Sequence, residues 1–337
     1  MPLSPIIPEK SNAIVNAVIK KLREETGREP DSEAIVKALN KITVWLYERG
    51  EYPLAEPVAR IAFDLAEQAL GKEHPDTLIS LNNLAGLYQA KGGYSEAEPL
   101  YQHALTMNER VLGAEHPNTL TSLNNLAELY QAQGRYGQAE PILQRVLAAS
   151  ERVLGAEHPR TLTSLNNLAG LYQAQGRHVE AEPLYQRALA AFEQVLGPEH
   201  PDTLTSLNNL AGLYYAQGRY SEAEPIYRRA LAASEWVLGT DHPDTLTSLD
   251  NLAALYRAQG RYEKAESLYQ HVMGARQHVF GAEHPDTLRT QLNLVVTHIN
   301  NQQIPLALQE LREMDARLQG FVGSQFDNTL PEQVRQQ

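Results

Sequence analysis

Residues 116–136 read HPNTLTSLNNLAELYQAQGRY, and nearly the same string returns as HPRTLTSLNNLAGLYQAQGRH at 158–178 and as HPDTLTSLNNLAGLYYAQGRY at 200–220. The His-Pro dipeptide that opens each copy recurs every 42 residues, at His74, His116, His158, His200, His242 and His284. A fixed period of this length is typical of solenoids, in which each repeat packs on its neighbours. The period is therefore the strongest indication of the fold.

The segment after each His-Pro has the periodicity of an amphipathic helix. Leu81, Leu84 and Ala85 share one helical stripe with Tyr88, so we expect this stripe to lie in the core. The segment ends at Gly92, where the absence of a Cβ allows the left-handed turn that closes a helix. The same glycine recurs at Gly134, Gly176, Gly218 and Gly260. The proline of each His-Pro is predicted to be the first helical residue, with the histidine packing against or capping the helix end.

A second apolar stripe follows this glycine in every unit. In one copy it consists of Ala97, Leu100, Tyr101, Ala104 and Leu105, which is the spacing of a second helix. We predict that Ser95 caps this helix in a capping box with Glu98, and that Ser221 and Glu224 repeat the arrangement. Prolines in the first helical turn break no hydrogen bond, and we place four there. They are Pro99, Pro141, Pro183 and Pro225.

The pattern extends beyond the near-identical copies. A diverged unit starts near Asp31, and a last helix pair runs from about Pro285 to Leu318. In the diverged unit, Trp45 is expected to lie in the core. The predicted regions are an N-terminal segment with a capping helix (1–30), a solenoid of about seven helix pairs (31–320) and a polar C-terminal tail (321–337).

Three motifs taken together resemble the tetratricopeptide repeats of kinesin light chains, whose units also have 42 residues. They are LNNLAxLYxAQGRY, xEAEPLYQRAL and VLGxEHPDT, and the resemblance covers roughly residues 31 to 318. It implies an all-α fold, a right-handed solenoid of antiparallel helix pairs. Kinesin light chains bind the heavy chain through a long coiled coil before the repeats. About 30 residues precede the first unit here, so we expect a free-standing member and no kinesin heavy chain as partner.

Charge and composition narrow the partners. The net charge is −12, and because affinity for nucleic acid comes largely from Lys and Arg that neutralise phosphates, nucleic acid is not expected as a partner. The sequence has no cysteine, which excludes disulfides and thiolate chemistry. No stretch approaches the roughly 18 apolar residues of a membrane span, and the N-terminus lacks a signal-peptide pattern. We therefore expect a cytoplasmic protein that does not contact membranes.

The resemblance also implies a concave groove lined by the first helices, on the stripe one residue along from the core leucines. The candidate peptide-binding residues on this stripe are Asn82, Asn124, Asn166, Asn208, Gln89, Gln131, Gln173, Tyr215, Arg257 and Arg289. An asparagine amide offers two donors and an acceptor, which match a peptide main chain. A solvated surface copied by duplication is the alternative for these asparagines. The adjacent asparagines are expected to be structural; they are Asn83, Asn125, Asn167, Asn209 and Asn251.

Departures from the repeat on this stripe are predicted to carry information about the partner. They are Ile79, Glu128, Tyr215, Asp250, Arg257 and Arg289. The stripe is mostly neutral and becomes basic at Arg257 and Arg289. An acidic peptide would therefore place its charge near those two arginines.

No catalytic motif occurs in the chain. We find no Walker loop, no GxGxxG after a strand and no GxSxG, so we predict neither an enzyme nor a cofactor. No metal site is predicted either, because histidines placed one per repeat cannot meet at one ion whose ligands lie about 2 Å away. The sequence predicts a scaffold that binds a protein or peptide of unknown identity. The alternative is a structural or self-associating solenoid with no peptide ligand.

Overall fold

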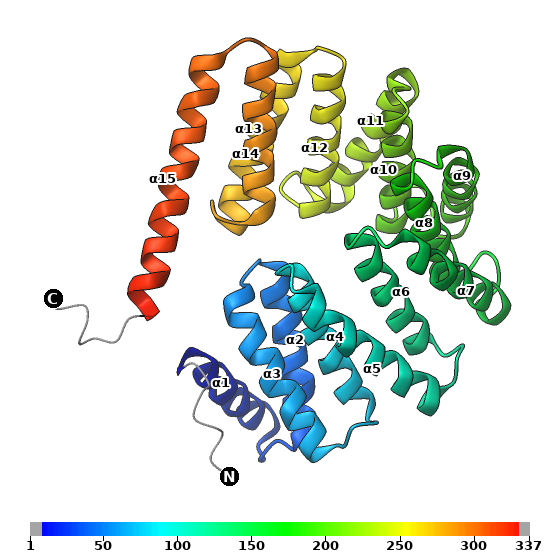
Figure 1. Cartoon of the computed structure of the whole chain (residues 1–337), viewed down its shortest axis with the longest axis vertical. Coiled ribbons are helices and arrows are strands. Elements are labelled where there is room, and N and C mark those ends of the chain that lie inside the picture. The colour runs from blue at the N-terminus through cyan, green and yellow to red at the C-terminus, as the bar shows by residue number, and fades with distance from the viewer. Residues whose placement is uncertain (1–8, 330–337) are drawn as a thin grey trace. The chain divides into compact units, whose positions relative to one another are not determined.

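The computed structural model describes the backbone of residues 9–329 and the side chains of residues 12–317. It is all-α over this range, without a strand (Figure 1). In chain order the helices are α1 (Glu9–Thr26), α2 (Ser32–Glu48), α3 (Tyr52–Ala69), α4 (Pro75–Ala90), α5 (Tyr94–Leu112), α6 (Pro117–Ala132), α7 (Tyr136–Leu154), α8 (Pro159–Ala174), α9 (His178–Val195), α10 (Pro201–Ala216), α11 (Tyr220–Leu238), α12 (Pro243–Ala258), α13 (Tyr262–Phe280), α14 (Pro285–Asn300) and α15 (Ile304–Thr329). No helix of this described part is both long and apolar enough to cross a membrane.

The chain divides into two compact units, residues 1–181 and 182–337. In each unit, helices adjacent in sequence pack on one another as antiparallel neighbours. First helices of successive repeats also touch, as α2 touches α4 in unit 1 and α10 touches α12 in unit 2. The structure thus confirms the prediction of an all-α solenoid built from antiparallel helix pairs.

The His-Pro dipeptides start the first helices as predicted. At every copy the histidine is the N-cap and the proline is the first helical residue. His116 Nδ1 accepts a hydrogen bond from the backbone N–H of Asn118 at 3.1 Å, which satisfies one of the donors that a helix start leaves open. Thr119 then donates its hydroxyl to the Gly113 carbonyl at 2.7 Å and fixes the preceding linker. Gly113 itself has a φ of 93°, which explains why glycine ends the second helix.

The second helices begin earlier than predicted, and the capping box is wrong. α5 starts at Tyr94 with Gly93 as its N-cap, so Ser95 lies inside the first turn and makes no cap. Ser221 and Glu224 likewise lie inside α11, whose N-cap is Arg219. The early start also moves the prolines beyond the first turn into the helices, where a proline removes one main-chain hydrogen bond. These are Pro99, Pro141, Pro183 and Pro225.

The glutamate of the supposed capping box instead joins neighbouring repeats. Arg135, in the turn after α6, lies 4.3 Å from the ring centre of Tyr130 and donates to Glu98 of α5 at 2.6 Å. Hydrogen bonds from Arg135 lower the pKa of Glu98. The same three-residue contact recurs as Arg177 with Tyr172 and Glu140, Arg219 with Tyr214 and Glu182, and Arg261 with Tyr256 and Glu224. We call this contact the Arg-Tyr-Glu clasp.

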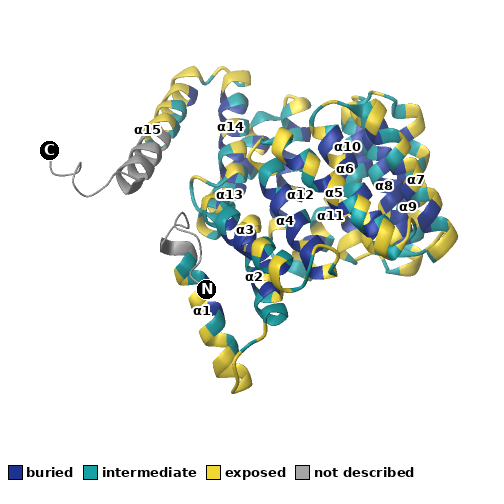
Figure 2. Ribbon diagram, turned by 60° about the horizontal axis from the view of Figure 1, so that its bottom comes forward, coloured by how far each residue is buried: buried dark blue, intermediate teal, exposed yellow. Residues whose placement is uncertain are grey.

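The core runs between the helices of each unit. Figure 2 shows the buried residues on the faces that neighbouring helices turn toward one another. Leu123 of α6 packs with Val146 of α7, and Leu249 of α12 packs with Val272 of α13. Burial of each such side chain stabilises the fold by about 1.5–3 kcal/mol. The predicted core tyrosines are buried at Tyr130, Tyr172, Tyr214 and Tyr256. Trp45 was predicted wrongly, because it is 55% exposed, with the guanidinium of Arg49 5.0 Å from its ring centre.

Two helices flank the repeated pattern. α1 buries Val15 and Val18 against the first helix pair. From α2 to α15 first and second helices alternate along the described chain, seven of each. α15 continues to Thr329, nine residues past the predicted end of the solenoid, so the predicted tail begins as helix. Its last part, residues 330–337, lies outside the described residues.

Candidate functional site

In unit 1 a pocket of about 320 Å³ opens between the first helices α2, α4 and α6. Its lining is Thr43, Val44, Tyr47 and Glu48 of α2, Asn82, Asn83, Gly86, Leu87 and Gln89 of α4, Tyr101 of α5, and Asn125 and Glu128 of α6. We call it the Glu128 pocket. Two predicted contact residues, Asn82 and Gln89, lie in it. Its lining includes Asn82, Gly86 and Gln89, three residues of the stripe on which the sequence predicts a groove.

Unit 2 has a smaller pocket of about 220 Å³, between α10, α11 and α12. Its lining is Pro201, Leu204, Thr205, Asn208, Asn209, Ser234, Leu238, Asp244, Thr247 and Asn251. The Ser234 hydroxyl and the Asn208 Oδ1 atom are buried there, and neither has a hydrogen-bond partner among the described residues. Asn208 is thus the one predicted contact residue that lines this second pocket.

The asparagines predicted to bind a peptide are partly occupied by contacts between repeats. Asn82 Nδ2 donates to the Leu78 carbonyl at 3.0 Å and lies 3.5 Å from the Ser122 hydroxyl of the next first helix. Asn208 Nδ2 makes the equivalent bonds to Leu204, at 3.2 Å, and to Ser248, at 2.9 Å. These amide N–H groups therefore hold neighbouring repeats together and are not free donors.

The asparagine atoms of this stripe that have no partner among the described residues are hydrogen-bond acceptors. The Oδ1 atoms of Asn82, Asn124 and Asn208 are buried without a hydrogen-bond partner among the described side chains. Asn166 is only 8% exposed. Gln131 and Gln173 lie half-buried on the same helices. Peptide contact by these residues stays a prediction.

The second asparagine of each pair lies on a pocket wall. Asn83 and Asn125 line the Glu128 pocket, while Asn209 and Asn251 line the pocket of unit 2. Asn83 also has a structural contact, because its Nδ2 lies 3.4 Å from Asn40 Oδ1. Asn83 thus has a structural contact as expected, and the structural role of the other second asparagines stays a prediction.

Asp250 was predicted as a groove residue, and the structure corrects this. It is 8% exposed and its carboxylate lies 3.5 Å from the guanidinium of Arg276, whose side chain is 2% exposed. Asp250 replaces the asparagine of the contact between repeats, and Thr290 donates its hydroxyl to it at 3.1 Å. This departure from the repeat therefore concerns packing between α12, α13 and α14.

The two arginines of the predicted basic end have partners within unit 2. Arg257 Nη1 lies 3.3 Å from Asn293 Oδ1, and its guanidinium is 5.8 Å from the ring centre of Tyr269. Arg289 is exposed and pairs with Asp286 at 3.0 Å. Tyr215 packs against Tyr220, with ring centres 5.8 Å apart.

Glu128 dominates the electrostatics of its pocket. The residue is exposed, but the protein atoms around its carboxyl displace water and raise its pKa. Burial, followed by the charge of Glu128, raises the pKa of Tyr101 above its usual range, and the same carboxylate adds to the raised pKa of Tyr47. These three side chains therefore lie close enough to influence one another. The sequence showed Glu128 as an irregularity but not its neighbours.

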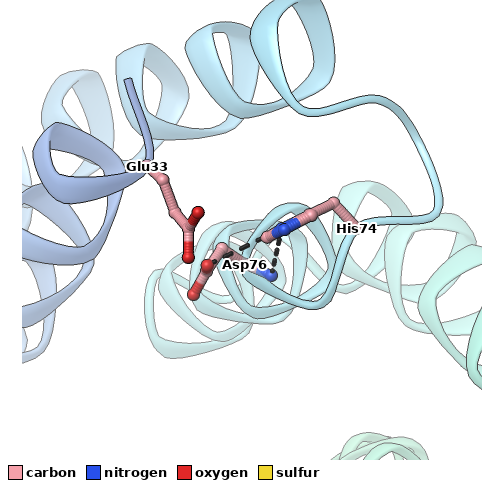
Figure 3. Close-up of side chains that lie close together, drawn as sticks. All are labelled: Glu33, His74 and Asp76. Carbon is pink, nitrogen blue, oxygen red and sulfur yellow. Dashed lines mark hydrogen bonds and ion pairs between the residues drawn. The ribbon is translucent and has the colours of Figure 1, made fainter. Parts of the chain in front are cut away.

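A small cluster of possible metal ligands lies at the start of α4. Atoms of Glu33, His74 and Asp76 come within 4.8 Å of one another (Figure 3). The His74 Nδ1 atom accepts from the Asp76 backbone N–H at 3.2 Å, as in the other caps. Lys37 Nζ lies 2.5 Å from Glu33 and 3.8 Å from Asp76. Capping and ion pairing account for these groups, so we assign no metal site.

Comparisons with known proteins agree with the repeat fold. Family models described as tetratricopeptide repeat match residues 35–110, 81–152, 119–182, 160–235 and 245–286. A comparison with curated protein sequences finds no match.

The solved structures similar to this chain include the following three. A putative kinesin light chain with nearly identical tetratricopeptide-like repeats, from Podosopora anserina, is 33% identical over 61% of this chain and 97% of that chain, with a TM-score of 0.50. BtubC (BKLC) from P. vanneervenii is 26% identical over 72% of this chain and 93% of that chain, with a TM-score of 0.52. NprR, in complex with its cognate peptide NprX, is 15% identical over 96% of this chain and 90% of that chain, with a TM-score of 0.60. The family models together match well over half of the residues, so the chain belongs to the tetratricopeptide repeat family and is similar to its kinesin light chain-like members.

Proposed function

We propose that the protein is an interaction scaffold that binds an extended segment of a partner protein along the face lined by its first helices. The observation that carries this proposal is that two pockets, one in each unit, share three equivalent repeat positions, which are Asn82, Asn83 and Asn125 in unit 1 and Asn208, Asn209 and Asn251 in unit 2. In both units the asparagine pair of the LNNLA motif lines a pocket, together with residues of the next first helix. A surface that repeats at a fixed spacing suits a ligand with a repeating main chain.

The chemistry of these pockets is that of main-chain recognition. Amide side chains such as Asn83 and Asn125 face the Glu128 pocket, and Asn209 and Asn251 face the second one. Amides can both donate to and accept from peptide groups. Gln89, Gln131, Gln173 and Tyr215 extend the proposed contact surface. The fold supports this mode of binding, because NprR holds a peptide. That the chain is not an enzyme, and that it is cytoplasmic, stay predictions.

The proposal can be tested by site-specific cross-linking. Random peptides displayed on phage would first be selected on the immobilised full chain, and the selected peptides synthesised. Photoreactive benzoylphenylalanine would then be introduced at Gln89 and Asn209, which line the pockets, and at His103 and His271, which are exposed on second helices. We expect the peptides to cross-link at the first two positions and not at the second two.

The experiment also distinguishes the proposed scaffold from the alternative. A structural or self-associating solenoid would yield no specifically bound peptide, and cross-links would form only between copies of the chain. Cross-linking at His103 or His271 alone would place binding on the second helices and contradict the proposed site. Replacing the four stripe asparagines by alanine is a poorer test, because at Asn82 and Asn208 it would remove contacts between repeats.

A further inference from the structure

We infer that the Glu128 pocket binds a cationic side chain, lysine or arginine, of the partner segment. The inference rests on the proposed function and names the chemistry of one of its subsites. It differs from the expectation of an acidic peptide near Arg257 and Arg289, which concerns residues of unit 2 and the opposite charge. Every residue that carries the argument lies in unit 1.

Glu128 breaks the repeat at a position where other copies have almost no side chain. The same place in other first helices is taken by Gly86, Gly170, Gly212 and Ala254. A Cβ at Gly86 would lie 3.4 Å from the hydroxyl of Tyr101, and a Cβ at Gly212 would lie 3.5 Å from that of Tyr227. In those repeats a tyrosine hydroxyl therefore fills the space beside the first helix.

The repeat of Glu128 has no such tyrosine. Leu143 stands at the place of Tyr101 and is 2% exposed, so it offers Glu128 no hydrogen-bond donor. Among the described residues, no hydrogen bond or ion pair involves the carboxylate of Glu128 or that of Glu48 on the opposite wall. Two carboxylates thus face one pocket without a counter-charge.

The hydroxyls of Tyr47 and Tyr101 also line the pocket and can donate, but three of its polar groups can only accept. They are the carboxylates of Glu48 and Glu128 and the buried Oδ1 of Asn82, which has no partner among the described residues. Ammonium and guanidinium groups have donors and no acceptor, so they complement such a set. The ring of Tyr47 adds an aromatic surface on which a cation can rest.

Size and solvation agree with this assignment. A volume of about 320 Å³ is within the range of about 300–1,000 Å³ typical of small-ligand sites, and so accommodates a long side chain. Glu128 is exposed as a residue, and neighbouring protein atoms desolvate its carboxyl in part and raise its pKa. A bound cation would compensate that desolvation. Hydrogen bonds to charged groups are stronger than neutral ones, so this contact should influence affinity markedly.

The test uses the selected peptides and matched variants of the full chain. Affinity would be measured by fluorescence anisotropy for the wild type, Glu128→Gln and Glu157→Gln, the last being an exposed carboxylate in a linker outside the pocket. We expect the peptides to share one lysine or arginine. Replacing it by norleucine or citrulline should weaken binding to the wild type about tenfold or more and binding to Glu128→Gln much less. Glu157→Gln should behave as the wild type.

Dependence on pH provides a second readout. Affinity for the cationic peptide should fall in the wild type as the pH is lowered from neutral into the acid range, and earlier than for a glutamate of ordinary pKa, because the pKa of Glu128 is raised and protonation removes its charge. Tyr47 and Tyr101 also face Glu128 and stay neutral over this range, since their pKa values are raised. Glu48 is the other carboxylate of the pocket, and the Glu48→Gln variant shows how much of the pH dependence of affinity comes from it. Glu128→Gln should flatten the profile.

The failures can be told apart. If peptides bind and cross-link at Gln89 but neither the neutral replacement nor Glu128→Gln changes affinity, the cationic subsite is wrong and the scaffold function stands. If no peptide is selected, the proposed function itself fails. Glu128→Gly, which copies three other repeats, guards against misfolding of the glutamine variant. Circular dichroism should show the same helix content for both variants.

Discussion

Replacing Arg276 by asparagine should lower the free energy of unfolding of unit 2 by about 3 kcal/mol. The Arg276 side chain is 2% exposed and lies 3.5 Å from the Asp250 carboxylate, whose side chain is 12% exposed. Arg276 also donates to the Thr290 hydroxyl and to the Asp286 carbonyl. Without the guanidinium, Asp250 would keep only the Thr290 hydroxyl as a donor. Breaking a buried pair costs about 3–5 kcal/mol, and the slight exposure of Asp250 favours the lower value.

The equivalent contact in unit 1 shows which second substitution should restore the stability of unit 2. There the same positions are Asn82 and Asn108, and both amides approach one hydroxyl, that of Ser122, at 3.5 and 2.9 Å. The double variant Asp250→Asn with Arg276→Asn recreates this uncharged arrangement in unit 2. It should recover about 2 kcal/mol of the loss, because no unpaired carboxylate remains buried.

The measurement needs a local readout as well as a global one. Repeats of a solenoid can open separately, so urea unfolding followed by circular dichroism should be combined with hydrogen exchange of the α13 and α14 amides. The single variant should show faster exchange in these helices, and the double variant should restore protection. Equal losses in the single and double variants would refute the reasoning, since they would mean that the charge of Asp250 does not matter.

Three further predictions concern the repeat itself. His158→Ala should cost about 1 kcal/mol by removing an N-cap, while His158→Asn should keep the cap; urea unfolding would show the difference. Pro141→Ala should raise stability by about 1 kcal/mol or more, because Pro141 lies inside α7 and a proline removes a helical hydrogen bond. The equivalent position of α13 is Ser267, so the helix does not require proline there. A lower unfolding midpoint would contradict this prediction. The pKa of Glu98 is lowered, so its contact with Arg135 contributes stability above the unfolded pKa near 4.5. This stability is lost as the pH falls through the folded pKa. Glu98→Gln should therefore reduce the loss of stability in acid, as measured by unfolding curves at a series of pH values.

Features that depend on neighbours in sequence could be predicted well. The His-Pro starts, the glycine ends and the alternation of helices follow from local conformational preferences, which act within a few residues. The tyrosine stripe follows from helical periodicity alone, and Tyr130 and Tyr172 are buried as expected. One local prediction failed at Ser95, because Glu98 has a stronger partner in Arg135, 37 residues away, than in its own helix start.

Features that depend on contact between repeats could not be predicted in this way. Periodicity places Asn82 on a helix face but does not show that this face meets Ser122 of the next first helix. For the same reason Asp250 looked like a ligand contact, although its partner Arg276 lies in a different helix. Trp45 was assigned to the core by residue type, but the surface of α2 that carries it is not covered by another described helix.

Residues of the second helices therefore influence what each repeat can bind as much as residues of the first helices do. One buried position of the second helix lies beneath the face of the first helices, and its occupant changes along the chain: Asn108, Ser150, Phe192, Ser234 and Arg276. Asn108 and Arg276 fill the space with bonds to the neighbouring repeat. Ser234 is small, and the second pocket is found beside it. Near-identical first helices can thus acquire different pockets through single changes in a layer that a ligand need not touch.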